Sequence, residues 1–206
     1  MKKYLIGAFC LALLTGTTAC DSGNSEQTID ATATAAAPDS TLSEDRQKLL
    51  AYTARHFILQ QELASLAQQK AQTDSLKLYA EEMKSWATTK QNELKDLEQQ
   101  YSFTLPQQLS EDEQEYLEEP RKADAKNFDA EMWDNLVDAQ KDAIDHIDDN
   151  TKNIASSDAS AFAIWERNTL KELRARMERA AAYELELKNR NEGGGISKPI
   201  VDEINN

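Results

Sequence analysis

The chain has 206 residues, with 37 Asp or Glu against 23 Lys or Arg, and its formal net charge is −14. A surface this acidic argues against nucleic acid as a partner and against docking on anionic lipid through basic patches. Only two cysteines are present, Cys10 and Cys20, so the composition does not indicate a disulfide framework or a thiolate metal site.

The N-terminus has the pattern of a secretory signal. A basic start at residues 1–3 precedes an apolar run at residues 4–14, and small residues then lead to Cys20. The run is too short to span a membrane, and this order is typical of a cleaved signal. Because a cysteine follows the cleavage point, the segment resembles a bacterial lipoprotein signal, although Thr17 stands where that motif usually has Leu. The resemblance implies that residues 1–19 are removed and that Cys20 carries lipid.

This resemblance sets the expected location and partners. It implies a lipid-anchored protein of the bacterial cell envelope, at the periplasmic face or the outer membrane. The expected partners are the membrane, through the lipid on Cys20, and an envelope protein that the sequence does not name. Residues 20–42 are small, polar and low in complexity, and they predict a flexible stalk. No thiol other than Cys20 is left after cleavage, so we expect the fold to depend on packing alone.

Residues 43–192 contain four long stretches in which apolar side chains recur every three to four residues, which predicts helices. The predicted helices cover about residues 43–72, 73–101, 127–155 and, after a restart at residues 156–158, the segment up to the glycines at 193–195. A shorter helix is expected between the second and the third. Ser110 and Glu113 have the spacing of a capping box at its start, and Pro120 is expected to stop it.

These elements predict an all-α fold. No segment shows the alternation of a strand, and four long helices with short links within each pair are typical of an antiparallel four-helix bundle. The one long connection, between the second and third helices, holds the short extra helix. Residues 193–206 begin with three glycines and predict a flexible C-terminal tail rather than a partner-binding peptide.

Several short motifs occur in a characteristic order along the helices, at residues 61–67, 103–106, 109–110, 128–129, Asp134 and residues 169–170. Together they resemble a family of ferritin-like bacterial envelope proteins that is described only as a domain of unknown function, and sometimes as predicted outer-membrane proteins. The match covers about residues 48–190, and the order and spacing of the motifs carry it. It implies a ferritin-like bundle with a metal site built from a Glu, two Asp-His pairs and a His.

The chain departs from that pattern at every ligand position. The Glu of the first helix falls on Gln60, and the His of the fourth falls on Arg176. The two Asp-His pairs fall on Trp86 and Ala87 and on Ala139 and Gln140. The resemblance therefore implies a metal site that has been lost, and we predict no metal and no other cofactor.

The histidines support the same prediction without the family. A di-metal carboxylate bundle uses Glu-x-x-His pairs, because both ligands then reach the ion from successive turns. Three positions before His56 and His146 stand Thr53 and Ala143, so neither histidine completes such a pair.

The predicted site is a polar layer inside the bundle, formed by Gln60, Gln140 and Arg176, with His56 and Lys90 on the same inner stripes. Buried polar groups need partners, so we expect a hydrogen-bonded layer that sets the helix register, or Arg176 and Lys90 extended to the edge. The alternative is a small pocket that binds an anion through Arg176.

The leading prediction for function is a non-enzymatic binding or structural module. No catalytic residues are assigned, because neither a Gly-x-Ser-x-Gly motif nor a Gly-rich phosphate loop is present. One alternative is a metal-dependent oxidoreductase or metal-storage protein. The other is a small-ligand carrier that uses the polar interior of the bundle.

Overall fold

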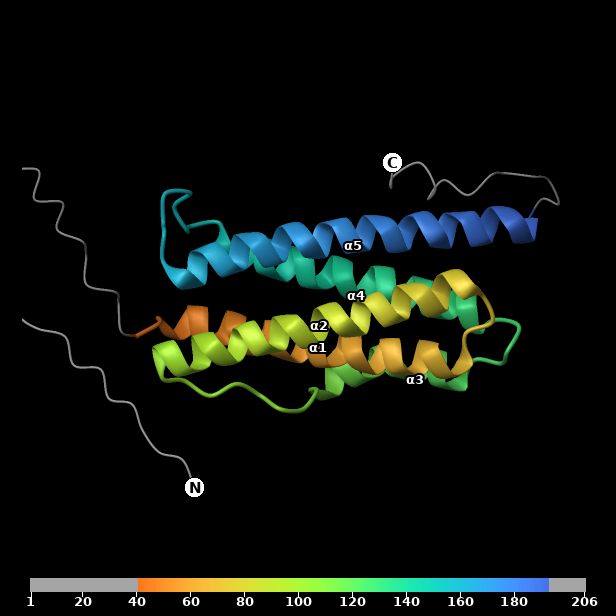
Figure 1. Ribbon diagram of the computed structural model, residues 1–206, viewed down its shortest axis with the longest axis horizontal. Helices are drawn as coiled ribbons and strands as arrows, with labels where there is room; N and C mark the ends of the chain where they lie inside the picture. Colours follow the sequence, from red (N-terminus) through yellow and green to blue (C-terminus); the bar gives the residue numbers. More distant parts are fainter. Residues whose placement is uncertain (1–40, 193–206) are drawn as a thin grey trace, which may run out of the picture. The chain divides into compact units, whose positions relative to one another are not determined.

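The computed structural model describes residues 41–192, and this part of the chain is all-α, with five helices and no strand (Figure 1). The all-α prediction is confirmed. The predicted signal peptide at 1–19, the lipidated Cys20, all but the last two residues of the stalk and the tail at 193–206 lie outside the described residues.

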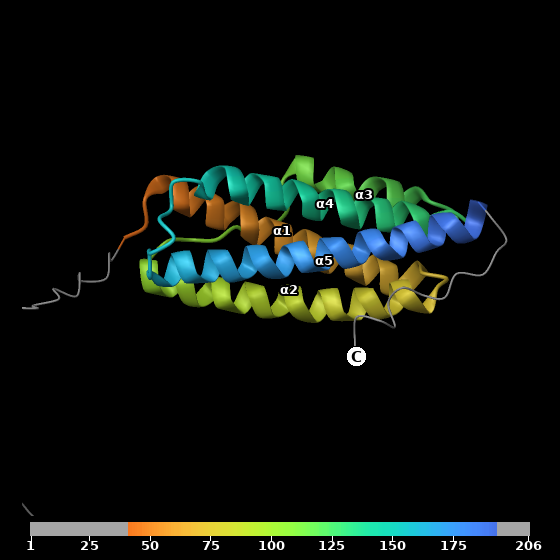
Figure 2. The ribbon, with the colours of Figure 1, turned by 90° about the horizontal axis from the view of Figure 1, so that it is seen from above.

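The long helices lie side by side, and the short α3 lies beside α1 and α4 (Figures 1 and 2). α1 and α2 form one helical hairpin, α4 and α5 form another, and the two hairpins meet through contacts of α1 with α4 and of α2 with α5. The bounds are α1 Glu44–Lys70, α2 Asp74–Tyr101, α3 Glu111–Lys122, α4 Phe128–Thr151 and α5 Ala161–Glu192.

Side-chain caps explain where several helices begin. The Ser43 hydroxyl accepts a hydrogen bond from the Arg46 backbone N–H at 3.4 Å, and α1 starts directly after it. The predicted capping box of α3 is confirmed, because Ser110 and Glu113 bond each other's backbone N–H groups. At α5 the hydroxyl of Ser160 accepts from Ala163, so the helix starts a few residues later than the predicted restart. In each case a serine satisfies an N–H group that the helix leaves open.

Three predicted helix ends differ from the observed ones, and α1 ends at Lys70 rather than at about residue 72. α3 continues past Pro120 to Lys122. The carbonyls that the end of this helix leaves free, those of Pro120 and Arg121, accept hydrogen bonds from Lys70 of α1. α4 ends at Thr151 rather than at residue 155, because the N–H of Ile154 bonds the carbonyl of Thr151 in a tight turn. The local sequence pattern does not predict the contact of Lys70 with α3, because this contact joins segments that are distant in sequence.

The packed part of the chain also begins earlier than predicted. Leu42, assigned to the stalk, is only 6% exposed and belongs to the hydrophobic core. Its carbonyl accepts a hydrogen bond from the Gln47 side chain at 2.9 Å. The packed region therefore starts at Leu42.

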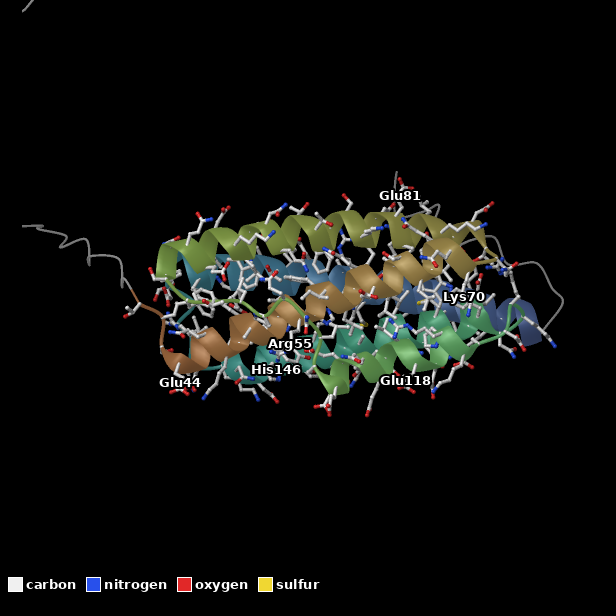
Figure 3. All side chains as sticks on the ribbon, turned by 90° about the horizontal axis from the view of Figure 1, so that it is seen from below. Glu44, Arg55, Lys70, Glu81, Glu118 and His146 are labelled. Carbon is white, nitrogen blue, oxygen red and sulfur yellow. The ribbon has the colours of Figure 1, made fainter. Side chains whose placement is uncertain are left out.

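The core between the helices is apolar and rich in aromatic rings. Tyr79 packs edge-on against Trp133, with ring centroids 5.0 Å apart, and Trp133 stacks on Tyr183. Acidic side chains such as those of Glu44, Glu81 and Glu118 lie on the outside (Figure 3). Among the described residues, a minority of the buried side chains are polar, and Gln60, Gln140, His56 and Lys90 among them belong to the candidate site.

Candidate functional site

A layer of polar side chains crosses the interior, and two of the predicted residues meet in it. Gln60 on α1 and Gln140 on α4 are both fully buried. The amide nitrogen of Gln140 donates to Oε1 of Gln60 at 3.3 Å. Each amide occupies a position at which the resemblance puts a metal ligand, and the pair bonds within itself instead.

Tyr79 on α2 completes the layer, and the sequence analysis did not assign it there. The Gln140 amide donates to the Tyr79 oxygen at 2.9 Å, and the Tyr79 hydroxyl donates to the backbone carbonyl of Arg176 at 3.1 Å. Burial raises the pKa of the Tyr79 phenol, so the hydroxyl stays protonated and remains a donor. A buried tyrosine generally requires a hydrogen-bond partner, and this general rule was the available signal.

Arg176 takes part differently from the prediction. Only its backbone carbonyl joins the layer, and its guanidinium lies over the ring of Trp86, 4.6 Å from the ring centroid. Among residues 41–192 the guanidinium makes no hydrogen bond to Gln60 or Gln140. Burial lowers the pKa of Arg176, because partial removal from water disfavours the charged form. The side chain therefore runs toward the surface along an aromatic face, rather than bonding neutral amides in the core.

The guanidinium reaches a groove between α2 and α5 with a volume of about 740 Å³. In this groove the buried Lys90 amine lies 3.0 Å from carboxylate oxygens of both Glu93 and Glu172. The indole nitrogen of Trp86 donates to Glu172 at 2.6 Å. Glu172 was not identified from the sequence, although a buried lysine requires an acidic partner. The Lys90 charge is thus already compensated by protein groups.

His56 lies one turn from Gln60 on the same helix and is 3% exposed. Its Nε2 atom has no hydrogen-bond partner among the described residues. Burial lowers the pKa of His56 to about 3, so the imidazole is neutral at physiological pH. The layer of Gln60, Gln140 and Tyr79, with His56 one turn away, therefore contains no charged side chain.

This interior does not fit the metal site that the resemblance implies. The inner positions of Gln60 and Gln140 offer carboxamides, whereas bundle di-metal sites use carboxylates and imidazoles. Within residues 41–192, no three His, Cys, Asp or Glu side chains lie close enough to hold an ion together. No helix in the same described part is both long and apolar enough to cross a membrane.

A family model described as a domain of unknown function (DUF4142) matches residues 31–182, most of the chain. The chain belongs to this family. The match confirms the part of the resemblance that concerned a domain of unknown function. No curated protein and no solved structure matches the chain. A ferritin-like fold and an envelope location therefore stay predictions for this DUF4142 member.

Proposed function

We propose that the chain is a lipid-anchored envelope protein whose helices form a ferritin-like, antiparallel four-helix bundle without a metal site, and that this bundle acts as a non-enzymatic binding or structural module. The short α3 would be the extra helix in the long connection between α2 and α4. The lipid on Cys20 would hold the bundle at the membrane.

The observation that carries this proposal is the bond between Gln60 and Gln140. Ligand positions of an active di-metal site hold groups that bind cations. These two hold neutral amides, and the Gln140 amide nitrogen donates to Gln60 and to Tyr79, while the Gln60 amide nitrogen has no partner among the described residues. Arg176, at a third such position, has no group that binds cations, and its guanidinium lies over the ring of Trp86. These substitutions favour a module that uses the bundle as a scaffold.

The same geometry disfavours the carrier that uses the bundle interior. Gln60 and Gln140 are fully buried, and core side chains surround them. A ligand entering this layer would have to break hydrogen bonds between buried amides, which costs about 1–3 kcal/mol for each group left unpaired. A binding role therefore belongs on the outer surface of the bundle.

Metal analysis tests the proposal. The chain, purified without chelator, should contain no stoichiometric iron, manganese or zinc by elemental analysis. The same preparation dialysed against EDTA serves as the control and should show an unchanged melting temperature. One or more tightly held ions per chain, with a melting temperature that falls on chelation, would support the metal-dependent enzyme or storage protein instead.

A further inference from the structure

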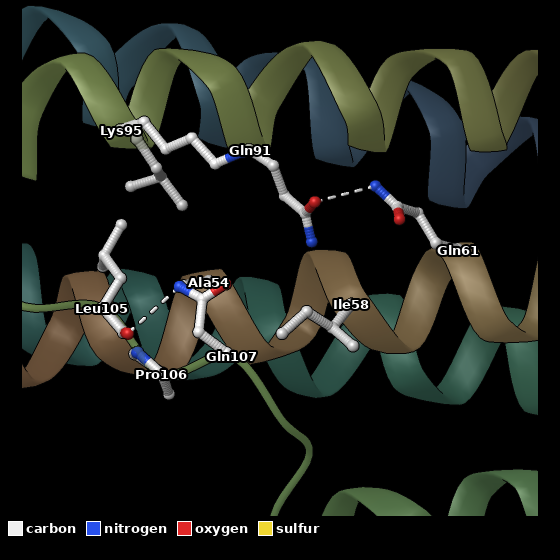
Figure 4. A pocket seen from close by; sticks show the side chains of 9 residues that line it. Ala54, Ile58, Gln61, Gln91, Lys95, Leu105, Pro106 and Gln107 are labelled. Carbon is white, nitrogen blue, oxygen red and sulfur yellow. Dashed lines mark hydrogen bonds between the residues drawn. The ribbon is translucent and has the colours of Figure 1, made fainter.

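A pocket of about 230 Å³ lies between α1, α2 and the segment that follows α2 (Figure 4). It is separate from the polar layer and from the groove beside Arg176. Gln91 and Lys95 line its α2 side, Gln61 lines its α1 side, and residues 105–107 close one end (Figure 4). The pocket is smaller than the roughly 300–1,000 Å³ of sites for drug-sized molecules, so it suits a small ligand.

The lining has an unusual charge for this protein. The chain carries a net charge of −14, yet none of the nine lining residues is acidic and one of them is Lys95. Within residues 41–192, Lys95 forms no ion pair. An exposed ammonium without a carboxylate partner, at the edge of a pocket without acids, favours a ligand that carries one negative charge.

The amides of the pocket offer one donor and one acceptor. Gln61 donates to Oε1 of Gln91 at 3.0 Å, which orients both side chains. Among the described residues, the amide nitrogen of Gln91 donates no hydrogen bond, and the amide oxygen of Gln61 accepts none. A peptide group has the complementary pair, a carbonyl oxygen and an N–H. The apolar lining, formed by Ala54, Ile58, Leu94, Leu105 and Pro106, suits small aliphatic side chains.

We propose that this pocket binds the C-terminal end of a short peptide, with its carboxylate on Lys95, a peptide group between Gln61 and Gln91, and small apolar side chains on the pocket floor. None of the nine lining residues is aromatic, so no ring face is present for a nucleobase to stack on. This proposal names the class of ligand for the binding module proposed above, and it rests on that proposed function.

Titration of the full chain in detergent with N-acetyl-alanyl-alanine, followed by ligand-observed NMR at low salt, tests the pocket. The matched ligand is the same dipeptide with a C-terminal amide, which removes the negative charge. We expect saturable binding of the acid and about fivefold weaker binding of the amide, the effect of one exposed charge pair. Absence of saturable binding of the acid would overturn the proposal.

Two variants locate the binding. The Lys95→Gln variant should bind the acid and the amide with equal affinity. Lys77 is an exposed lysine of the same helix outside the pocket, so Lys77→Gln should preserve the difference in affinity. Gln91→Leu should weaken both ligands by at least about fivefold, with an unchanged circular dichroism spectrum. An acid–amide difference that survives Lys95→Gln would overturn the assignment. Bound metal would overturn the proposed function without affecting this titration, because the pocket and the polar layer are separate.

Discussion

The Gln140 carboxamide joins α4 to α1 and α2, because it donates to Gln60 and to Tyr79. The Tyr79 hydroxyl in turn donates to a backbone carbonyl of α5. Replacing a residue with such a role leaves several buried groups without partners. Arg176 lies beside this layer but contributes a backbone carbonyl, which every amino acid supplies. The two residues should therefore respond very differently to substitution.

Arg176→Met should lower the free energy of unfolding by no more than about 1–2 kcal/mol. The variant loses the contact of the guanidinium with Trp86, worth about 0.5–1 kcal/mol at an exposed site, and keeps the carbonyl that Tyr79 bonds. Gln140→Leu is the comparison and should cost more, about 1–3 kcal/mol for each partner left unpaired. Urea denaturation of both variants measures this. A larger loss for Arg176→Met than for Gln140→Leu would contradict the assigned roles.

His56 should make the fold sensitive to acid. Burial lowers its pKa from 6.5 to about 3. Between these two pH values the imidazole is protonated in the unfolded chain and neutral in the folded chain. This contribution to stability is present above pH 6.5 and is lost as the pH falls toward 3. Between pH 7 and pH 5 the loss amounts to about 2 kcal/mol.

Replacement of His56 by Leu removes this titration. The difference in unfolding free energy between the parent and His56→Leu should therefore change by about 2 kcal/mol from pH 7 to pH 5, in the direction that disfavours the parent. Burial also lowers the pKa of His146, but this histidine is less buried, so His146→Leu should show a smaller change. Parallel pH profiles for the parent and His56→Leu would show that folding does not change the pKa of His56.

Two charged residues, Lys70 and Asp129, connect the α1–α2 turn to the end of α3 and the start of α4. Lys70, the last residue of α1, donates to the carbonyls of Pro120, Arg121 and Ala123 at 2.9–3.1 Å. Asp129 of α4 accepts from the backbone N–H groups of Gln72 and Thr73. These contacts satisfy backbone groups that the helix ends leave open, and they set where α3 ends and α2 begins.

Lys70→Met should destabilise the chain by about 2 kcal/mol, because hydrogen bonds to a charged group contribute more than neutral ones. The variant also loses the contact of the ammonium with the Phe128 ring, 4.8 Å from its centroid. Lys77→Met, an exposed lysine of α2, should change stability by less than about 0.5 kcal/mol. Hydrogen exchange should rise at the end of α3 in Lys70→Met alone. Equal effects of the two variants would show that the carbonyl contacts are not stabilising.

At the scale of the whole molecule, Cys20 should be the only membrane attachment. No helix among residues 41–192 is long and apolar enough to cross a bilayer, and the acidic surface does not favour anionic lipid. The Cys20→Ser variant should therefore leave the membrane fraction. The Cys10→Ser variant, whose substitution lies in the apolar run of the predicted signal, should stay in that fraction. A Cys20→Ser protein that is processed and still pellets with membranes after a carbonate wash would contradict this prediction.

The sequence predicted the helices well because their information is local. Apolar side chains at helical spacing, and serine caps such as Ser43 and Ser110, depend on neighbours along the chain. The ends of α3 and α4 were less well predicted. The carbonyls of the last turn of α3 accept hydrogen bonds from Lys70, which is distant in sequence. Helix propensity depends on local sequence and does not predict such a contact.

The all-α class, the approximate helices and the inner positions of Gln60 and Gln140 follow from the residue pattern alone. Which polar groups meet depends on how the helices pack. Tyr79 joins the two amides, Arg176 turns away onto Trp86, and Lys95 faces a pocket without acids. The physical reason is that helical periodicity assigns a residue to a face, whereas hydrogen bonds and cation–π contacts depend on the distance between atoms of different helices, which packing alone sets.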